Sequence, residues 1–378
     1  MTDQTAQTLS PDDAQLAAVL RLALVPGVGP RLRQNLLESF GTCQSILEAS
    51  TEQLRRTPGI GAKLADRIAA ARDQIDVEAL LTLAARHGID VLTESSDGYP
   101  RMLREIHDPP GVLFVHGQLQ PVDALAIAIV GTRHASHYGR QQAERLAGSL
   151  ARAGLTIVSG LARGIDAAAH RGALAAGGRT IAVLASGLLN IYPPEHVDLA
   201  DEVRQHGAVV SEAPPRAQPL AGAFPQRNRL ISGLSLGVIV VEAATRSGAL
   251  ITARHATEQG REVFAVPGRV DNRLAHGCHR LLRDGAKLVE TADDVLEELG
   301  PLVEATPRDD GTTIHHPAEL SLNDVEQQVL QAVGTNPTSL DAVIRTSGLP
   351  APRVLSTVSV LEMRRLLRRV SGNQVMRG

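Results

Sequence analysis

The feature that most constrains this chain is an alternation of short apolar runs with helical stretches over residues 88–300. The apolar runs, rich in Val, Ile, Ala and Leu, are 124–130, 155–158, 180–185, 208–211, 238–241, 263–266 and 287–289. The helical stretches between them are 141–153, 165–176, 197–205 and 251–259. Nearly continuous apolar runs are typical of parallel strands buried on both faces. The alternation therefore predicts a doubly wound, Rossmann-like α/β fold with a parallel sheet, and residues 89–92 and 112–116 add two strands before it.

Helical segments flank this region on both sides. Residues 1–87 are rich in Ala and Leu, and the hairpin sequence of residues 25–30 is repeated at residues 57–63. Each copy follows one helical run and opens another, which is the helix-hairpin-helix pattern. The two glycines of such a turn leave backbone N–H groups that can bind a DNA phosphate, although the same turn also serves to pack two helices. Both interpretations stay open.

The chain after residue 300 falls into a linker and a second small domain. Residues 301–318 contain Pro, Thr, Asp and His without periodicity, as a linker does. Residues 319–378 give helices at 323–333, 340–345 and 351–363, then a strand–turn–strand with its turn at 371–373, which is the outline of a winged helix. The basic cluster of this segment can meet phosphates of double-stranded DNA, but it also suits a protein-binding module. Its members are Arg364, Arg365, Arg368 and Arg369.

Composition and charge restrict the cellular compartment in which the protein can work and the kinds of partner it can bind. The 378 residues carry a formal net charge of −3, so that a nucleic-acid site must be a local patch. Cys43 and Cys278 lie far apart in sequence, which argues against a disulfide framework. No apolar run reaches the roughly 18 residues of a membrane span, and residues 1–11 lack a signal-peptide pattern. We therefore expect a cytoplasmic protein without a membrane partner.

The residues that follow the strands point to the site, because ligands of an open α/β sheet bind at the carboxyl ends of its strands. Small residues cluster there, in turns that each open a helix and so favour an anion. Arg133 stands immediately past the first long strand, where a cation would overhang the edge. A second cluster, residues 224–229, places an aromatic ring and two guanidinium groups just before a predicted helix, a combination that suits single-stranded DNA.

Other chemistries are disfavoured by what these strand ends lack. The first strand is followed by Gly131 alone instead of G-x-G-x-x-G, and no P-loop pattern is present, so we expect no nucleotide cofactor. The acids near strand ends are explained as structural residues of helix starts. They are Asp166, Glu195, Glu212 and Glu242. The His276–His279 stretch resembles a metal motif but has no second ligand pair. The sequence therefore predicts a protein that is not an enzyme.

Ordered motifs across the middle segment resemble the DprA/Smf family of DNA-processing proteins. They are residues 128–136, 158–170, 224–229, 247–253 and 265–268. The resemblance implies a homodimer that binds single-stranded DNA, protects incoming DNA in natural transformation and helps to load a RecA-type recombinase. The candidate DNA-binding residues are Gly131, Thr132, Arg133, Ser159, Gly160, Leu161, Ala162, Arg163, Gly164, Phe224, Arg227, Asn228, Arg229, Ser247 and Gly248. The chain departs from the family pattern at residues 194–196 and 279–282.

Two rival functions differ in class. Rossmann-like nucleotide phosphoribohydrolases resemble this sheet, but they carry a PGGxGT-type motif near a Glu, and here residues 242–245 follow the strand without it. The other rival is an adaptor that binds only the recombinase. Turnover of a nucleoside monophosphate and titration with an oligonucleotide separate these functions from DNA binding.

Overall fold

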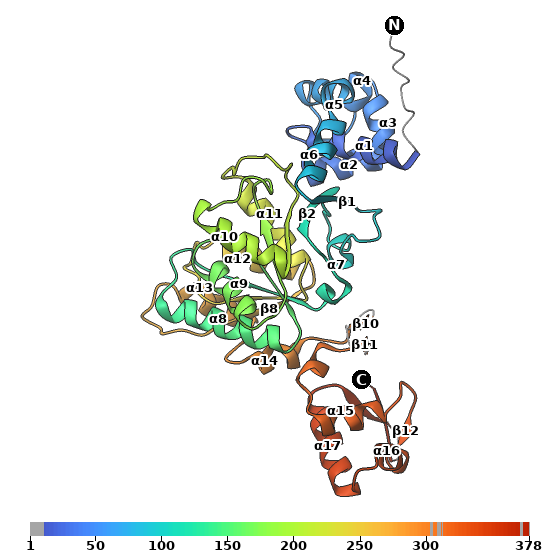
Figure 1. Cartoon of the computed structure of the whole chain (residues 1–378), viewed down its shortest axis with the longest axis vertical. Coiled ribbons are helices and arrows are strands. Elements are labelled where there is room, and N and C mark those ends of the chain that lie inside the picture. Colours follow the sequence, from blue (N-terminus) through green and yellow to red (C-terminus); the bar gives the residue numbers. More distant parts are fainter. Residues whose placement is uncertain (1–10, 303–304, 308–310, 312, 371–372, 378) are drawn as a thin grey trace. The chain divides into compact units, whose positions relative to one another are not determined.

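The computed structural model of the chain describes residues 11–302, 305–307, 311, 313–370 and 373–377 (Figure 1). The chain divides into two compact units, each assembled from two stretches of sequence. Unit 1 consists of the described part of Met1–Leu119 together with Ile181–Leu234. Unit 2 consists of Gln120–Thr180 together with the described part of Ser235–Gly378. Each unit holds part of the α/β region and one of the two terminal domains.

The N-terminal part of unit 1 is helical, as predicted. Its helices are α1 (Pro11–Leu24), α2 (Pro30–Phe40), α3 (Cys43–Glu48), α4 (Thr51–Leu54), α5 (Ala62–Gln74) and α6 (Val77–Arg86). Leu22, Leu36 and Ile68 belong to the core that these helices share. The repeated Pro-Gly pairs form the turns before α2 and α5, and Gly27 and Gly59 have φ of +97° and +88°. Only glycine adopts that backbone without strain, which explains the repeat. The helix-hairpin-helix prediction is confirmed.

The rest of unit 1 is an α/β segment with mixed strand directions. Its elements are β1 (Ile89–Thr93), α7 (Arg101–Arg104), β2 (Val112–Gly117), β5 (Thr180–Leu184), η2 (Pro194–His196), α10 (Val197–Gln205), β6 (Gly207–Ser211) and α11 (Ala223–Gly233). The strand order in this unit is β1-β2-β6-β5. β2 pairs antiparallel with both β1 and β6, so the two strands predicted ahead of the parallel sheet form an antiparallel edge.

The sheet of unit 2 is parallel. Its elements are η1 (Pro121–Ala124), β3 (Ala126–Val130), α8 (His137–Arg152), β4 (Thr156–Ser159), α9 (Ile165–Ala175), β7 (Gly237–Val240), α12 (Ala249–Glu258), β8 (Glu262–Ala265), α13 (His276–Arg283), β9 (Lys287–Leu288) and α14 (Ala292–Glu298). The strand order is β4-β3-β7-β8-β9, and β3 pairs parallel with both of its neighbours. Each predicted strand lies within two residues of the observed bounds. All five residues of β3 are buried, as the apolar run indicated.

Small residues let helices α8 and α9 approach closely on this sheet. A Cβ atom on Gly172 would lie 2.4 Å from the carbonyl oxygen of Glu144, so that a larger residue would push the helices apart. Leu146, Leu150 and Ile157 belong to the apolar core that these helices and the strands share. The Ala- and Gly-rich sequence of this region is therefore a requirement of close packing.

The C-terminal part of unit 2 is a winged helix. It comprises α15 (Asp324–Gln331), β12 (Thr338–Ser339), α16 (Leu340–Ser347), α17 (Ala351–Met363), β13 (Leu367–Val370) and β14 (Gln374–Arg377). The strand order is β12-β14-β13 around a buried core that includes Val329, Val343 and Leu361. Of the predicted wing turn, Ser371 and Gly372 lie outside the described residues.

The predicted linker contains short structured pieces. They are β10 (Thr306–Pro307), β11 (Thr313–Ile314) and the 3-10 helix η3 (Pro317–Ser321), which begins inside residues 301–318. The domain boundaries 1–87, 88–300, 301–318 and 319–378 stay predictions. Across the described parts of the chain, none of the helices combines the length and the apolar character that crossing a membrane would need.

Candidate nucleic-acid interface

The structure brings together three of the predicted turns at one edge of the unit 2 sheet. β4, β3 and β7 are neighbouring parallel strands, so their carboxyl ends and the turns that follow lie side by side. These turns carry residues 131–136, 159–164 and 242–248. The Gly131–Arg133, Ser159–Gly164 and Ser247–Gly248 candidates therefore share one edge, which we call the rim.

Backbone hydrogen bonds join the turns of the rim directly. The N–H of Thr132 donates to the carbonyl of Glu242 (2.7 Å), and the N–H of Ile165 donates to the carbonyl of Thr132 (3.3 Å). Gly131 permits this approach, because a Cβ there would lie 2.5 Å from the Ile165 side chain. At Gly164, φ is +77° and a Cβ would lie 2.3 Å from the Thr132 carbonyl oxygen. Gly131 and Gly164 are thus required by the packing of one turn on another, whereas a Cβ on Gly248 would meet open space.

The turn between β4 and α9 is organised by a buried carboxylate. Asp166 accepts hydrogen bonds from the backbone N–H groups of Gly160 (3.1 Å) and Ala162 (3.4 Å). The hydroxyl of Ser159 donates to the carbonyl of Ile129 (2.6 Å), and the Leu161 side chain is fully buried. Asp166 and its neighbours build the loop, as the sequence analysis expected of an acid at a helix start. Within the loop, the exposed long side chain is that of Arg163.

Glu242 also has a structural place in the rim. Its carboxylate is 3% exposed and accepts from the backbone N–H of Ser136 (2.9 Å) and from the Ser136 hydroxyl (2.6 Å). Ser136 in turn caps α8 by accepting from the N–H of Gly139 (3.0 Å). The charge of Glu242 therefore already lies at the positive end of α8.

The backbone N–H groups at the helix starts, which were expected to attract an anion, are largely hydrogen-bonded within the protein. At α9, the N–H groups of Ile165, Ala167 and Ala168 donate to backbone carbonyls. At α12, the N–H groups of Leu250 and Ile251 also donate to backbone carbonyls. Most of the helix-start amides that the sequence analysis assigned to phosphate are thus satisfied within the protein.

Arginine side chains supply the positive charge of the rim. Arg133, Arg163 and Arg246 are exposed, and each belongs to a different one of the three turns. Guanidinium groups bind phosphate oxygens through paired N–H donors. Arg246 was not among the predicted site residues, although its position indicated it: it stands three residues before α12, in the turn that contains the predicted residues Ser247 and Gly248.

The second predicted cluster belongs to unit 1 and differs from its prediction. Phe224, Arg227, Asn228 and Arg229 lie inside α11 and not ahead of a helix. Pro225 did not prevent this, because proline is tolerated in the first turn of a helix. The Phe224 ring packs edge-to-face on Tyr192 with a centroid distance of 5.7 Å.

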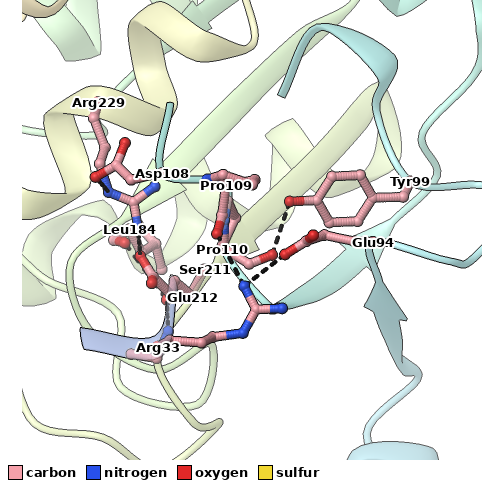
Figure 2. A network of polar contacts seen from close by, with 11 residues as sticks. Arg33, Glu94, Tyr99, Asp108, Pro109, Pro110, Leu184, Ser211, Glu212 and Arg229 are labelled. Carbon is pink, nitrogen blue, oxygen red and sulfur yellow. Dashed lines mark hydrogen bonds and ion pairs between the residues drawn. The ribbon is translucent and has the colours of Figure 1, made fainter. Parts of the chain in front are cut away.

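The two arginines of this cluster are buried. Arg229 is 3% exposed and pairs with Asp108 (Nε to Oδ2, 3.2 Å) and with Glu212 (Nη2 to Oε2, 2.6 Å), as Figure 2 shows. Burial raises the pKa of Glu212, whereas the Arg229 charge lowers it. Arg227 is 6% exposed, and its Nη1 donates to the carbonyl of Val183. In this structure both guanidinium groups hold α11 in place and do not project into solvent as the sequence analysis assumed.

The same network reaches the helical domain of unit 1. Figure 2 shows Arg33 of α2 beside Glu94, with Nη1 2.6 Å from Oε1 and 3.5 Å from the Pro109 carbonyl oxygen. Asp108, which precedes that proline, pairs with Arg229. One short segment thus connects α2 with α11.

Two histidines of unit 2, one in α9 and one in the predicted metal-like stretch, face hydroxyl or backbone groups. His170 Nδ1 is 2.7 Å from the Thr180 hydroxyl, which donates to the Ile157 carbonyl and so accepts from the ring. His279 Nε2 lies 2.9 Å from the Gly268 carbonyl oxygen. Burial raises the pKa of the Cys278 thiol to about 11. Within the described ranges, no group of three or more His, Cys, Asp or Glu side chains is placed to hold a metal ion.

Comparison with known proteins identifies the family. The model for DNA recombination-mediator protein A matches residues 90–300. The DprA winged helix domain matches residues 314–373, and a SAM-like helix-hairpin-helix tandem matches residues 19–73. These ranges agree with the three structured parts described above.

Relatives extend the match. Protein Smf of Escherichia coli K12 is 42% identical over 286 residues, which cover 75% of this chain and 76% of the relative. The X-ray structure of DNA processing protein A from Streptococcus pneumoniae superposes with a TM-score of 0.65 at 36% identity, covering 75% of this chain and 98% of that one. The structure of DNA processing protein A from Helicobacter pylori, described with a unique single-stranded DNA-binding mode, has a TM-score of 0.50 at 32% identity and covers 55% and 93%. This chain belongs to the DprA/Smf family of DNA-processing proteins.

Proposed function

We propose that the chain binds single-stranded DNA at the rim of unit 2. The observation that carries this proposal is the presence of Arg133, Arg163 and Arg246 on three adjacent turns. Three guanidinium groups along one sheet edge suit the evenly spaced charges of a strand. The single-stranded DNA-binding mode described for the Helicobacter pylori protein supports the same class of ligand.

The rim should read phosphates and not bases. Thr132 and Ser159 engage their neighbours in the protein, and the described turns of the rim contain no Phe, Tyr or Trp beside the arginines. Phosphate contacts fix the position of a strand without carrying sequence information. Binding should therefore be similar for unrelated sequences and should weaken steeply with salt.

In the cell, this activity would protect incoming DNA during natural transformation and assist loading of a RecA-type recombinase by a cytoplasmic homodimer. The supporting observation is family membership, including DNA processing proteins DprA of Bacillus subtilis (47% identity) and Streptococcus pneumoniae (48% identity). We infer no catalytic role. Glu242 and Asp166, the acids nearest the arginines along the chain, are committed to backbone N–H groups.

Titration of the full chain with fluorescent oligonucleotides tests the proposal. Single strands of poly-dT and of mixed sequence should bind with similar affinity, and both more tightly than a duplex of the same length. Binding to neither strand would refute the proposal and leave the adaptor role. Turnover of a nucleoside monophosphate that survives repurification and is lost on substitution of a rim residue would favour the hydrolase.

We also propose that the winged helix contributes affinity for double-stranded DNA. Arg364 and Arg369 of the predicted basic cluster pair with Glu326 and Glu362. Arg369 is nevertheless exposed, as are Arg365 and Arg368. Two of the four positive charges that the sequence placed in this cluster are therefore offset by carboxylates. Deletion of residues 317–378 should weaken duplex binding more than single-strand binding, and an equal loss of both would contradict this role.

A further inference from the structure

Unit 1 contains a cavity of about 390 Å³ that the rim does not involve. Its wall is formed by the end of α6, by β2 and β6, by α10 and by the turn after β5. The lining residues that carry charge or imidazole are Arg86, His87, His116, Asp201 and Arg204. Two arginines thus face one carboxylate.

The Arg204 guanidinium is held in a fixed orientation. Its Nε donates to Asp201 Oδ1 (2.8 Å), and its Nη1 donates to His116 Nε2 (3.3 Å). Burial and the nearby Arg204 charge lower the pKa of His116, so the ring is a neutral acceptor for that bond. Arg86 is exposed and makes no ion pair with any other described residue. One guanidinium is therefore pre-oriented and the second can adjust to a ligand.

A structural explanation covers part of this arrangement. Arg86 and Arg204 stand in the last turns of α6 and α10, where cations offset the negative end of a helix. That effect does not explain why cations from two helices line the same cavity together with two imidazoles. Convergence of cations from separate elements is typical of an anion site.

The remainder of the cavity is apolar and preformed. Leu188, Leu189 and Ile191 line it from the turn after β5. The N–H of Leu189 donates to the Pro215 carbonyl (2.8 Å), and the Asn190 amide donates to the Arg216 carbonyl (2.6 Å). The turn is therefore braced by a second loop. A charged end beside an apolar wall suits a ligand that has both an anionic group and a flat ring.

A second hollow, of about 580 Å³, is bordered by α6 and shares Arg86 with the first cavity. Its charged lining residues are Asp76, Glu78, Arg86 and Arg216, so that two carboxylates balance two guanidinium groups. The excess of cations is therefore confined to the first cavity, whose volume alone is within the range of about 300–1,000 Å³ that holds a ligand of drug size.

We propose that the cavity between α6 and α10 is an additional site for a nucleotide phosphate, which Arg86 and Arg204 bind while the sugar and base lie on Leu188, Leu189 and Ile191. The nucleotide belongs either to a bound DNA strand or to a free mononucleotide. The inference rests on the proposed function only if the nucleotide belongs to a DNA strand. The site itself consists of unit 1 residues alone.

The test uses the full chain with the substitutions Arg86→Ala and Arg204→Ala, singly and together. Arg72→Ala is the matched control, because it removes an exposed arginine of α5 that lines neither hollow. Circular dichroism checks the fold of each variant. The probes are dAMP, measured by equilibrium dialysis, and labelled poly-dT, measured by anisotropy over a salt series.

Two results support the site and identify its ligand. If dAMP binds wild type and the double variant loses at least tenfold in affinity, with 8-azido-dAMP labelling the 188–191 segment, the ligand is a free nucleotide. If poly-dT binding weakens and the slope of log affinity against log salt falls by about 0.7 per lost contact, the ligand is a strand. Unchanged binding of both probes in the folded double variant would overturn the site. The dAMP measurement does not depend on DNA binding by the rim, so it tests the site even if the proposed function is wrong.

Discussion

Glu242→Gln is the substitution that most sharply separates a structural from a catalytic carboxylate at the rim. The change preserves the size of the side chain and removes its charge. Glu242 is 3% exposed and accepts from both the N–H and the hydroxyl of Ser136. Gly139 packs so closely that a Cβ there would lie 2.3 Å from a Glu242 oxygen, which leaves the new amide little room to turn away.

The expected cost follows from these contacts. A glutamine retains one acceptor oxygen and turns an NH₂ group toward the other donor. Hydrogen bonds to charged groups contribute about 1.5–3 kcal/mol each, and a negative charge at a helix start adds about 0.3–1 kcal/mol. We expect the free energy of unfolding to fall by about 2–4 kcal/mol. With a urea m-value of about 3 kcal/mol/M, the unfolding midpoint moves down by about 1 M.

Urea titration followed by circular dichroism measures this shift, and hydrogen exchange of α8 peptides localises it. Glu258→Gln is the matched control, because that carboxylate lies on the surface of α12 and pairs only with exposed or half-buried partners. Its effect should stay within about 0.5 kcal/mol. An unchanged midpoint for Glu242→Gln, combined with loss of a nucleotide-hydrolysing activity, would refute the structural role.

Three further predictions concern buried groups. Arg229→Ala leaves two carboxylates uncompensated and should destabilise the protein by about 3–5 kcal/mol in a urea titration, so that a fully stable variant would contradict the network in Figure 2. Cys278 has a thiol pKa of about 11 and no exposed surface, so a thiol reagent at pH 8 should label it only after unfolding, and rapid labelling of the native protein would be inconsistent with its burial. Burial and the Arg365 charge lower the pKa of His316 to about 4, and its Nδ1 accepts from the N–H of Ala318 (3.0 Å). The unfolded chain then binds a proton below about pH 6.5 that the folded chain does not bind. The η3 segment, whose Ala318 belongs to the core of the winged helix, should therefore lose up to about 3 kcal/mol of folding stability between pH 6.5 and 4. Hydrogen exchange of that region should show the loss in wild type and not in His316→Asn.

The strands were predictable from sequence because their burial leaves a local trace. Every residue of β3 is buried, and the run at 124–130 is apolar without interruption. The turns of the rim were predictable for a related reason: Gly131 and Gly164 stand where a Cβ would collide with a neighbouring turn. In both cases a requirement of tertiary packing restricts the residue type at a position, and this restriction is visible in the local sequence.

The burial of Arg227 and Arg229 could not be predicted in the same way. Arginine is usually exposed, and the two acids that compensate Arg229 lie at positions 108 and 212, far from it in sequence. The helix-start amides raise the same difficulty, because the carbonyls that satisfy them come from other turns. Contacts between residues far apart in sequence determine which polar groups remain available for a ligand. Local sequence patterns do not indicate these contacts.

The measurement that most directly tests binding at the rim is the salt dependence of poly-dT affinity for a variant in which Arg133, Arg163 and Arg246 are all replaced by Ala. Arg152→Ala is the control, since that exposed arginine stands in the last turn of α8, away from the carboxyl ends of the strands. Each lost phosphate contact lowers the slope of log affinity against log salt by about 0.7 for single strands. The account predicts that the triple variant stays folded, binds more weakly and loses about 2 from the slope, while Arg152→Ala matches wild type. A folded triple variant with wild-type affinity and slope at every salt concentration would contradict the account.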